Sequence, residues 1–575
     1  MRVSGRAAGF DAVRLLDAVR RFRVTVDETR FPLELPGVDR ARSGRVELLN
    51  QLDDYIIPRV SSLDAPLLAV VGGSTGAGKS TLVNSLVGTV LSRSGVLRPT
   101  TRASVLVHHP ADERWFADDR VLPGLGRLTG AQGADDDPGS VRLASTTAIP
   151  QGIALLDAPD IDSVVQANRD LARQLLSAAD LWVFVTTAAR YADAVPWELL
   201  RQAEARGTSV AIVLDRVPPE AVGELRAHLG EMLREQGLGA APIFTVTETR
   251  LDDTGLLPVA EVQPLRDWLG GLATDSASRA AVIRQTLTGA LSSLRGRTTG
   301  LAAASRDQYA ASKALRDCAW AAYGAAVDGV IEGMADGTLL RGEVLGRWQE
   351  LVGTGELFRK IESGVGRMRD RVVAAFTGRG NEVRADRLGE ALQTGVAALI
   401  TSHAQGASSS IARQWRSMPG GADLIRQYPT LTHASPDIPD RVAHLVRSWQ
   451  SELLELVRTE AGGKRKTARF LALGVNGAAV LLMLVVFVST AGLTGAEVGI
   501  AGGSAVLAQR LLEAVFGDQA VRTLAANARS SLVEKTKELF ATEHERYDVV
   551  LRGSGVDPRA ADEMVAAGNA IEAAR

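Results

Sequence analysis

An eight-residue glycine-rich motif, Gly73–Ser80, constrains the fold of this 575-residue chain more than any other feature. Its sequence, GSTGAGKS, matches the pattern G-x-x-x-x-G-K-S/T at every fixed position. An apolar run that ends in glycine, Pro66–Gly73, precedes the motif, and a helical pattern, Lys79–Val90, follows it. Between a buried strand and a helix, the backbone N–H groups of such a loop can surround phosphate oxygens. The motif therefore predicts a phosphate-binding loop in an α/β domain, with a chance glycine-rich turn as the alternative.

The chemistry of the motif assigns roles to its residues. Lys79 can contact the β- and γ-phosphates with its ammonium group, and the Ser80 hydroxyl can bind Mg²⁺ beside them. The helix that starts at Lys79 points its positive dipole end at the same anion. We expect the following residues to bind the nucleotide: Gly73, Ser74, Thr75, Gly76, Ala77, Gly78, Lys79, Ser80 and Thr81.

Two further positions are candidates for the metal site. Asp157 ends the apolar strand pattern Gly152–Asp157, where an acid is the usual second Mg²⁺ anchor; the alternative is an aspartate that caps a helix. Thr100 and Thr101 lie before the next strand pattern, where a threonine can close over the γ-phosphate and contact Mg²⁺; the alternative is an ordinary turn. We choose Thr101 because a basic residue follows it. The expected catalytic set is Lys79, Ser80, Thr101 and Asp157, and the expected metal ligands are Ser80, Thr101 and Asp157.

Strand and helix patterns alternate through the first half of the chain, which indicates an α/β fold with a mostly parallel sheet and helices on both faces. Strands are expected at Pro66–Gly73, Ala103–His109, Gly152–Asp157, Leu181–Thr187, Ser209–Asp215 and Pro242–Thr247. Beyond Asp275 only long helical patterns remain. We predict N-terminal helices that pack on a stalk (1–61), a P-loop domain (62–272), a helical bundle or stalk (273–465), a membrane hairpin (466–512) and C-terminal helices that return to the stalk (513–575).

The N-terminal helical pattern, Asp11–Arg30, has one apolar face that needs a partner. Val13, Leu16, Val19 and Phe22 lie on that face. We expect the face to pack on the C-terminal helical residues 510–545, with docking on the α/β domain as the alternative.

Composition excludes several classes of protein. The 65 basic and 67 acidic residues give a net charge of −2, which offers no sign of nucleic-acid binding. The single cysteine, Cys318, rules out an internal disulfide and any cysteine-based metal cluster. The first 30 residues mix charged and apolar side chains and do not resemble a signal peptide, so we expect the chain to start in the cytoplasm.

A long uncharged segment, Phe470–Ala496, predicts contact with a membrane. It is long enough to span the hydrocarbon core, which takes about 20 apolar residues. Basic residues stand directly before it at 464–466 and 469, and the positive-inside rule places that end in the cytoplasm. We therefore predict a two-pass hairpin over Phe470–Ala508 and a protein at the cell membrane with its bulk on the cytoplasmic side. The alternatives are a buried core helix, a re-entrant paddle and a single span.

Three motifs in order, GSTGAGKST, RPTTR and LLDAPDID, resemble the G domain of translation-factor-type GTPases. With its helical second half and late hydrophobic segment, the whole chain resembles a bacterial dynamin-like protein. The stretch Arg341–Lys360 is also similar to what actinobacterial members carry after the G domain. The resemblance implies GTP as substrate, Mg²⁺ as cofactor, a lipid membrane as target, no nucleic acid, and self-association through the G domain or pairing with a paralogous dynamin-like protein.

The chain departs from the family pattern in two motifs. The third motif, D-x-x-G, is here DAPD, with Asp160 in place of glycine, and the following Ile161 offers no glutamine to orient water. The base-reading motif N/T-K-x-D is replaced by Asp215, Arg216, Val217 and Pro218. Asp215 stands in the place of Asn and Arg216 can stack on the base, so both are candidate nucleotide ligands, although Pro218 replaces the final Asp. Guanine preference is therefore inherited from the resemblance.

Three functions stay open. The preferred one is a membrane-associated dynamin-like GTPase that couples GTP binding, hydrolysis and G-domain pairing to membrane remodelling, tethering or fusion. The second is a membrane-tethered P-loop NTPase that regulates a transporter or envelope complex. The third is a slow-hydrolysing nucleotide-binding scaffold, which Asp160 and Ile161 favour slightly.

Overall fold

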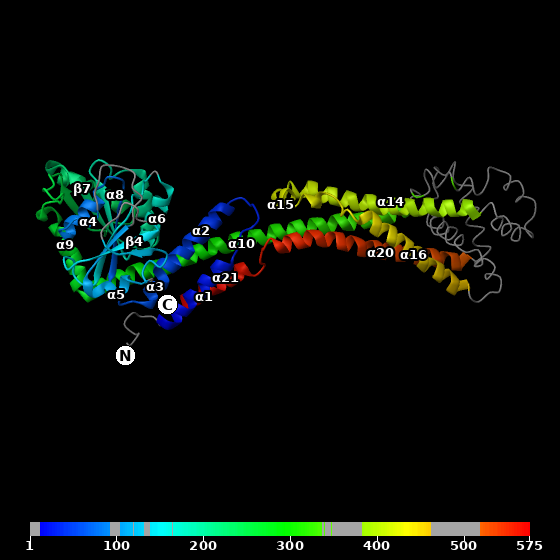
Figure 1. The fold of residues 1–575 in the computed structure, drawn as a ribbon, viewed down its shortest axis with the longest axis horizontal. Helices are drawn as coiled ribbons and strands as arrows, with labels where there is room; N and C mark the ends of the chain where they lie inside the picture. Colours follow the sequence, from blue (N-terminus) through cyan, green and yellow to red (C-terminus); the bar gives the residue numbers. More distant parts are fainter. Residues whose placement is uncertain are drawn as a thin grey trace, which may run out of the picture. The chain divides into compact units, whose positions relative to one another are not determined.

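The computed structural model describes residues 12–92, 104–118, 120–130, 139–163, 165–335, 339, 347, 382–461 and 518–575. The chain divides into two compact units (Figure 1). Unit 1 comprises Met1–Phe31, Gly37–Asp307 and Asp557–Arg575. Unit 2 comprises Pro32–Pro36 and Gln308–Val556.

An eight-stranded sheet forms the centre of the α/β part of unit 1. Its strand order is β3-β4-β2-β5-β1-β6-β7-β8, and all neighbours run parallel except β2 and β5. The predicted mostly parallel sheet is confirmed. The strands are β1 (Leu67–Gly73), β2 (Ser104–His108), β3 (Gly126–Leu128), β4 (Ser140–Ser145), β5 (Ile153–Asp157), β6 (Leu181–Thr187), β7 (Ser209–Val217) and β8 (Ile243–Thr247).

Helices cover both faces of the sheet because its central strands are apolar on both sides. Successive residues of β1 alternate between two cores: Val71 belongs to the core that includes α4 and α9, whereas Val70 belongs to the core that includes α6, α7 and α8. The helices are α4 (Lys79–Val87), α5 (Glu113–Phe116), α6 (Gln166–Ser177), α7 (Ala194–Ala205), α8 (Val222–Glu235) and α9 (Val259–Thr274), with 3₁₀ turns η2 (Pro110–Asp112) and η3 (Pro219–Ala221).

All six strands expected from the sequence are present, but β3 and β4 were missed. Five of the six are mostly buried along their length and therefore read as apolar runs, whereas β8 is mostly half-buried. By contrast, β3 has three residues and no buried one, and β4 is buried only in its first half. Apolar periodicity cannot identify such edge strands.

Helices from three parts of the sequence form the remaining core of unit 1. They are α1 (Ala12–Glu28), α2 (Val38–Gln51), the π-helical turn η1 (Leu52–Ile56), α3 (Ile57–Ser61), α21 (Ala560–Ala574) and the first part of α10 (Ser276–Ala335). Val19 and Phe22 of α1 are buried, and α1 packs against α21. The expected partner was residues 510–545, so this prediction is corrected. Val13, assigned to the apolar face, is 72% exposed.

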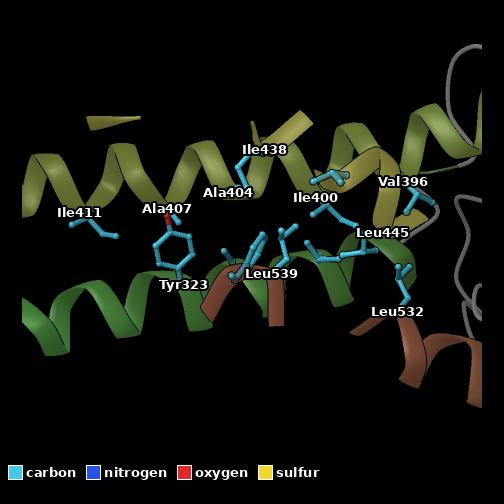
Figure 2. Packing of buried hydrophobic residues seen from close by; sticks show 14 of the residues in the cluster. Tyr323, Val396, Ile400, Ala404, Ala407, Ile411, Ile438, Leu445, Leu532 and Leu539 are labelled. Carbon is cyan, nitrogen blue, oxygen red and sulfur yellow. The ribbon is translucent and has the colours of Figure 1, made fainter. Parts of the chain in front are cut away.

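Unit 2 is a helical bundle with its core between α10, α14 (Glu382–Trp415), α16 (Ile438–Ala461) and α20 (Asp518–Gly553). Two short elements, α15 (Gly421–Gln427) and η5 (Pro429–Thr432), lie between α14 and α16 in the sequence. Figure 2 shows one side of α14 directed into this core through Val396, Ile400, Ala404, Ala407 and Ile411, spaced three or four residues apart. The indole N–H of Trp449 donates to the carbonyl oxygen of Ala528 at 2.9 Å, which links α16 to α20.

The prediction of a two-pass membrane hairpin is contradicted and is corrected. Within the described part of the chain, no helix has the length and apolar character needed to cross a bilayer. The segment chosen for the hairpin, 466–512, lies outside the described residues. Residues 513–575, treated as one segment in the sequence, contribute α20 to unit 2 and α21 to unit 1.

Candidate functional site

The glycine-rich motif forms a tight loop between β1 and α4, at the carboxyl end of the parallel strands. Its backbone requires glycine at both ends. A Cβ atom at Gly73 would lie 2.1 Å from the carbonyl oxygen of Val185, and one at Gly78 would lie 2.4 Å from the Oδ2 atom of Asp215. Gly78 also has a φ of +89°, a conformation that other residues rarely adopt. The expected strand–loop–helix context is therefore present.

Lys79, at the start of α4, lies inside the loop and is 6% exposed. Its ammonium group donates to the carbonyl oxygens of Gly73 at 2.9 Å and Ser74 at 3.0 Å, and to Oδ1 of Asp160 at 2.6 Å. An ammonium group has three N–H donors, so all three are used. The buried cation is thus fully paired within its own chain, and one partner is the aspartate that replaces the glycine of D-x-x-G.

A second carboxylate, Asp162, also binds the loop. The Thr75 N–H donates to Oδ1 of Asp162 at 2.6 Å, and the Thr75 hydroxyl donates to Oδ2 of Asp160 at 2.9 Å. Arg190 donates to Oδ2 of Asp162 at 2.9 Å and to the carbonyl oxygen of Thr75 at 3.2 Å. Burial opposes ionisation of Asp162, but the hydrogen bonds from Thr75 and Arg190 outweigh it and lower the pKa of this carboxyl. Two carboxylates therefore occupy donors that the loop could offer to phosphate.

Asp157 and Ser80 meet at the metal side of the loop. The Ser80 hydroxyl donates to Oδ2 of Asp157 at 2.6 Å, and the Ser92 hydroxyl donates to the same oxygen at 2.7 Å. The other oxygen, Oδ1, is buried without a hydrogen-bond partner in the described structure. Burial raises the pKa of Asp157, and the bonds from Ser80 and Ser92 offset it only in part. Mg²⁺ prefers hard oxygen ligands, so a hydroxyl and an unpaired carboxylate oxygen fit this ion.

Asp215 and Arg216 lie at the end of β7, beside the phosphate loop. Asp215 is buried, which raises the pKa of its carboxyl, and its backbone neighbour Arg216 has a φ of +54°. The Arg216 guanidinium is half exposed and donates to the carbonyl oxygen of Gly76. Positive φ in a non-glycine residue is uncommon and often occurs at binding sites. The strand thus brings both predicted base-side residues to the loop.

The comparison with known proteins agrees with this geometry over one part of the chain. Residues 68–217 match the model of the dynamin family. This chain carries a dynamin-family domain. The chain is also similar to a protein of Arabidopsis thaliana described as a probable transmembrane GTPase FZO-like, chloroplastic, at 26% identity over 135 residues. That alignment covers 24% of this chain, and the chain spans only 13% of the length of this relative.

Solved structures align with this chain at low identity and low TM-score. A chain of an oligomerised bacterial dynamin pair, described in connection with long-range sensing and tethering of membranes, aligns at a TM-score of 0.46 and 9% identity. The alignment covers 99% of this chain and 96% of that one. Era of Aquifex aeolicus aligns at a TM-score of 0.23 and 19% identity, over 36% of this chain and 57% of Era.

Sequence reasoning missed three polar contacts in the dynamin-family domain. Asp162 and Arg190 hold Thr75, and Ser92 binds Asp157; Arg190 and Ser92 belong to no motif, whereas Asp162 is the last residue of LLDAPDID. Ser92 is placed by Asn84, whose Oδ1 accepts from the backbone N–H of Ser92 at 2.9 Å. The one available signal was the pair of acidic residues Asp160, which ends the third motif, and Asp162, two residues beyond it. The predicted switch residue Thr101 lies outside the described residues.

Proposed function

We propose that this chain binds and hydrolyses GTP with Mg²⁺ and couples that cycle to membrane tethering, remodelling or fusion. One observation carries the proposal: Lys79, Ser80 and Asp157 converge on a glycine-rich loop within a dynamin-family domain. In this arrangement the loop N–H groups and Lys79 bind the β- and γ-phosphates. Ser80 and Asp157 hold Mg²⁺, which supplies neutralisation of charge on the phosphates. Thr101 remains our candidate for the switch residue.

Intrinsic hydrolysis by the isolated chain is slow in this proposal. Ile161, which follows Asp160, is 4% exposed and apolar, so it cannot orient an attacking water. A positioned group would then come from a second copy of the domain or from a paralogous dynamin-like protein. Self-association across the nucleotide face would therefore raise the rate.

Hydrolysis assays test the proposal directly. The wild-type chain should release phosphate from GTP in Mg²⁺, with a specific activity that rises with protein concentration. Asp157→Asn removes a charged ligand for the metal and should lower turnover by roughly a hundredfold. Asp170→Asn removes an exposed carboxylate on α6 and serves as the control. Equal turnover by Asp157→Asn and wild type would exclude the assigned site.

The membrane part of the proposal needs a separate test. Its support is the similarity of part of the chain to a relative described as a probable transmembrane GTPase. Anionic liposomes should accelerate hydrolysis, and nucleotide should cluster or deform the liposomes. If liposomes do not change hydrolysis and nucleotide does not change the liposomes, the membrane function is rejected. The proposed GTP hydrolysis would still stand.

A nucleotide-binding scaffold with little hydrolysis is the second candidate function. Two observations favour it: the Lys79–Asp160 ion pair at 2.6 Å and the buried Ile161. A scaffold would bind GTP with a rate of hydrolysis that neither protein concentration nor liposomes change.

A further inference from the structure

A second cationic site lies in unit 1, away from the phosphate loop. A cavity of about 510 Å³ opens between α2, the end of α7 and α10. Its lining includes Arg206, Arg297, Ser292, Gln202 and Glu47. An adjoining hollow of about 370 Å³ shares Arg297 and Glu47. No motif marks this region, and the function proposed above does not use it.

The two arginines of the cavity lack the partners that buried charges normally have. The Nη1 atom of Arg297 is buried and has no hydrogen-bond partner in the described structure. Burial lowers the pKa of Arg206 to about 10, with repulsion from Arg297 adding to the effect. Burial also lowers the pKa of Arg297. Both side chains are partly buried, and a desolvated charge without a partner is costly, so a negatively charged group would be favourable here.

The charged groups around the cavity are mostly positive, which favours an anion further. Arg575, at the end of α21, donates to the Ser292 hydroxyl at 2.7 Å, which brings a third guanidinium to the cavity. Glu47 attracts both lining arginines and is the one carboxylate among the described lining residues. Arg575 has its own acidic neighbour, Glu572, at 3.9 Å. The arginines that line the cavity therefore outnumber its carboxylate two to one.

We propose that this cavity binds a phosphate group held between Arg206 and Arg297. Guanidinium groups present forked N–H donors that match phosphate oxygens, and such charge-assisted bonds are among the strongest in proteins. A phosphate monoester carries about −1.5 to −2 charges at pH 7, which matches two guanidinium groups. The Ser292 hydroxyl accepts from Arg575 and can still donate its own proton to the ligand. The cavity also leaves room for the molecule that carries the phosphate.

Binding here would fasten the dynamin-family domain to α10 within unit 1. Arg206 directly follows α7, whereas Arg297 lies in α10. The two backbones already approach closely at the neighbouring Gly207 and Gly289, where an added Cβ atom would lie within 2.8 Å of the other chain segment. A phosphate between the arginines replaces their repulsion by two attractions, so the ligand stabilises this junction.

Titration with inorganic phosphate tests the site. The full chain carries Lys79→Ala in every sample, so that phosphate binding at the nucleotide loop does not contribute to the signal. Chloride controls match the ionic strength. Calorimetry should show binding of phosphate and the melting temperature should rise. Arg206→Gln and Arg297→Gln should each weaken binding about tenfold or more, because a charge-assisted bond is lost. Arg295→Gln removes an exposed arginine from the same helix and should leave binding unchanged.

Glu47→Gln provides a test that does not depend on removing an arginine. Losing the only carboxylate of the described lining should strengthen phosphate binding, whereas a purely structural role of Glu47 would weaken it. Absence of phosphate binding by the Lys79→Ala chain would overturn the proposal. Equal binding by Arg206→Gln, Arg297→Gln and their parent would do the same.

Vesicles distinguish the source of the phosphate. Phosphatidylcholine vesicles with and without phosphatidic acid provide a phosphate monoester on a lipid headgroup. If the ligand is a lipid headgroup, the parent chain should bind inorganic phosphate and should also bind vesicles only when they contain phosphatidic acid. Arg206→Gln and Arg297→Gln should both lose this vesicle binding. Binding of inorganic phosphate alone assigns a ligand that is free in solution. Since Lys79→Ala is present throughout, neither result depends on whether the chain hydrolyses GTP.

Discussion

The phosphate loop and the arginine cavity deal with buried positive charge in opposite ways. Lys79 has all three donors paired, one of them to Asp160. Arg297 has a buried nitrogen with no partner in the described structure, and Arg206 lines the same cavity. A ligand entering the loop must therefore displace an internal carboxylate, whereas a ligand entering the cavity meets unpaired donors. The comparison teaches that a recognisable motif does not identify the site that most needs an anion.

A buried arginine that has a carboxylate partner gives a reference for this comparison. Arg59 of α3 is 7% exposed and forms an ion pair with Asp180, which is fully buried. Asp180 also accepts from the backbone N–H of Leu68 at 2.9 Å. Asp180→Ala should lower the free energy of unfolding by about 3–5 kcal/mol, because it removes the only carboxylate paired with the buried Arg59 guanidinium in the described structure. Urea denaturation gives this value.

Arg206→Gln in phosphate-free buffer is the matched experiment. It removes a cation that has no hydrogen-bonded partner, so the free energy of unfolding should stay unchanged or rise. A loss comparable to that of Asp180→Ala would show that Arg206 is already paired, which would remove the contrast between the two arginines.

A buried carboxyl shows how a charge behaves when no cation accompanies it. Asp54, in η1, is 6% exposed and accepts one hydrogen bond, from Gln174 at 2.9 Å. Burial raises its pKa to about 6, despite that bond, and Asp53 adds repulsion. The folded state binds the proton more tightly than the unfolded state, so Asp54 stabilises the fold at low pH and loses this contribution as pH rises through about 6.

Asp54→Asn should remove this dependence while keeping the acceptor for Gln174. The wild-type free energy of unfolding should fall by about 2–3 kcal/mol more than that of the variant between pH 4 and pH 7.5. Parallel urea titrations at both pH values measure the difference. Identical pH profiles would mean that Asp54 is solvated in the folded state.

Asp160 offers the sharpest test of the paired loop. Asp160→Asn keeps the size of the side chain and removes its charge, so Lys79 is freed and repulsion of the phosphates falls. GTP affinity should rise about tenfold. Isothermal titration of both proteins in Mg²⁺ gives the ratio, with Asp170→Asn as the control for loss of one negative charge. An affinity that is equal to or lower than that of wild type would show that Asp160 does not compete with nucleotide.

The sequence predicted the strands whose buried side chains are apolar, and it predicted the phosphate loop because a motif marks it. β1, β5 and β6 were visible because their side chains are buried throughout, and Gly73–Ser80 because phosphate binding requires its glycines. The apolar face of α1 was visible too, but a helical pattern shows which side is buried and not which helix covers it, so α21 was missed as its partner. The membrane hairpin is contradicted, because no helix in the described part of the chain is long and apolar enough to cross a bilayer.

The remaining site features depend on tertiary structure. Asp162, Arg190 and Ser92 reach the loop from separate segments, and no spacing relates them. Arg206 and Arg297 are 91 positions apart in the sequence, in a chain with 65 basic residues. Only the fold shows that they share one cavity.

GTP binding by wild type and Lys79→Ala tests the central claim, that the loop Gly73–Ser80 is the nucleotide site. The wild-type chain should bind GTP in Mg²⁺ despite the Asp160 carboxylate. Lys79→Ala should weaken binding by roughly a hundredfold, because a cationic hydrogen bond to phosphate is lost and Asp160 is left without its partner. The same affinity in both proteins, with both folded by circular dichroism, would contradict the assignment of the loop.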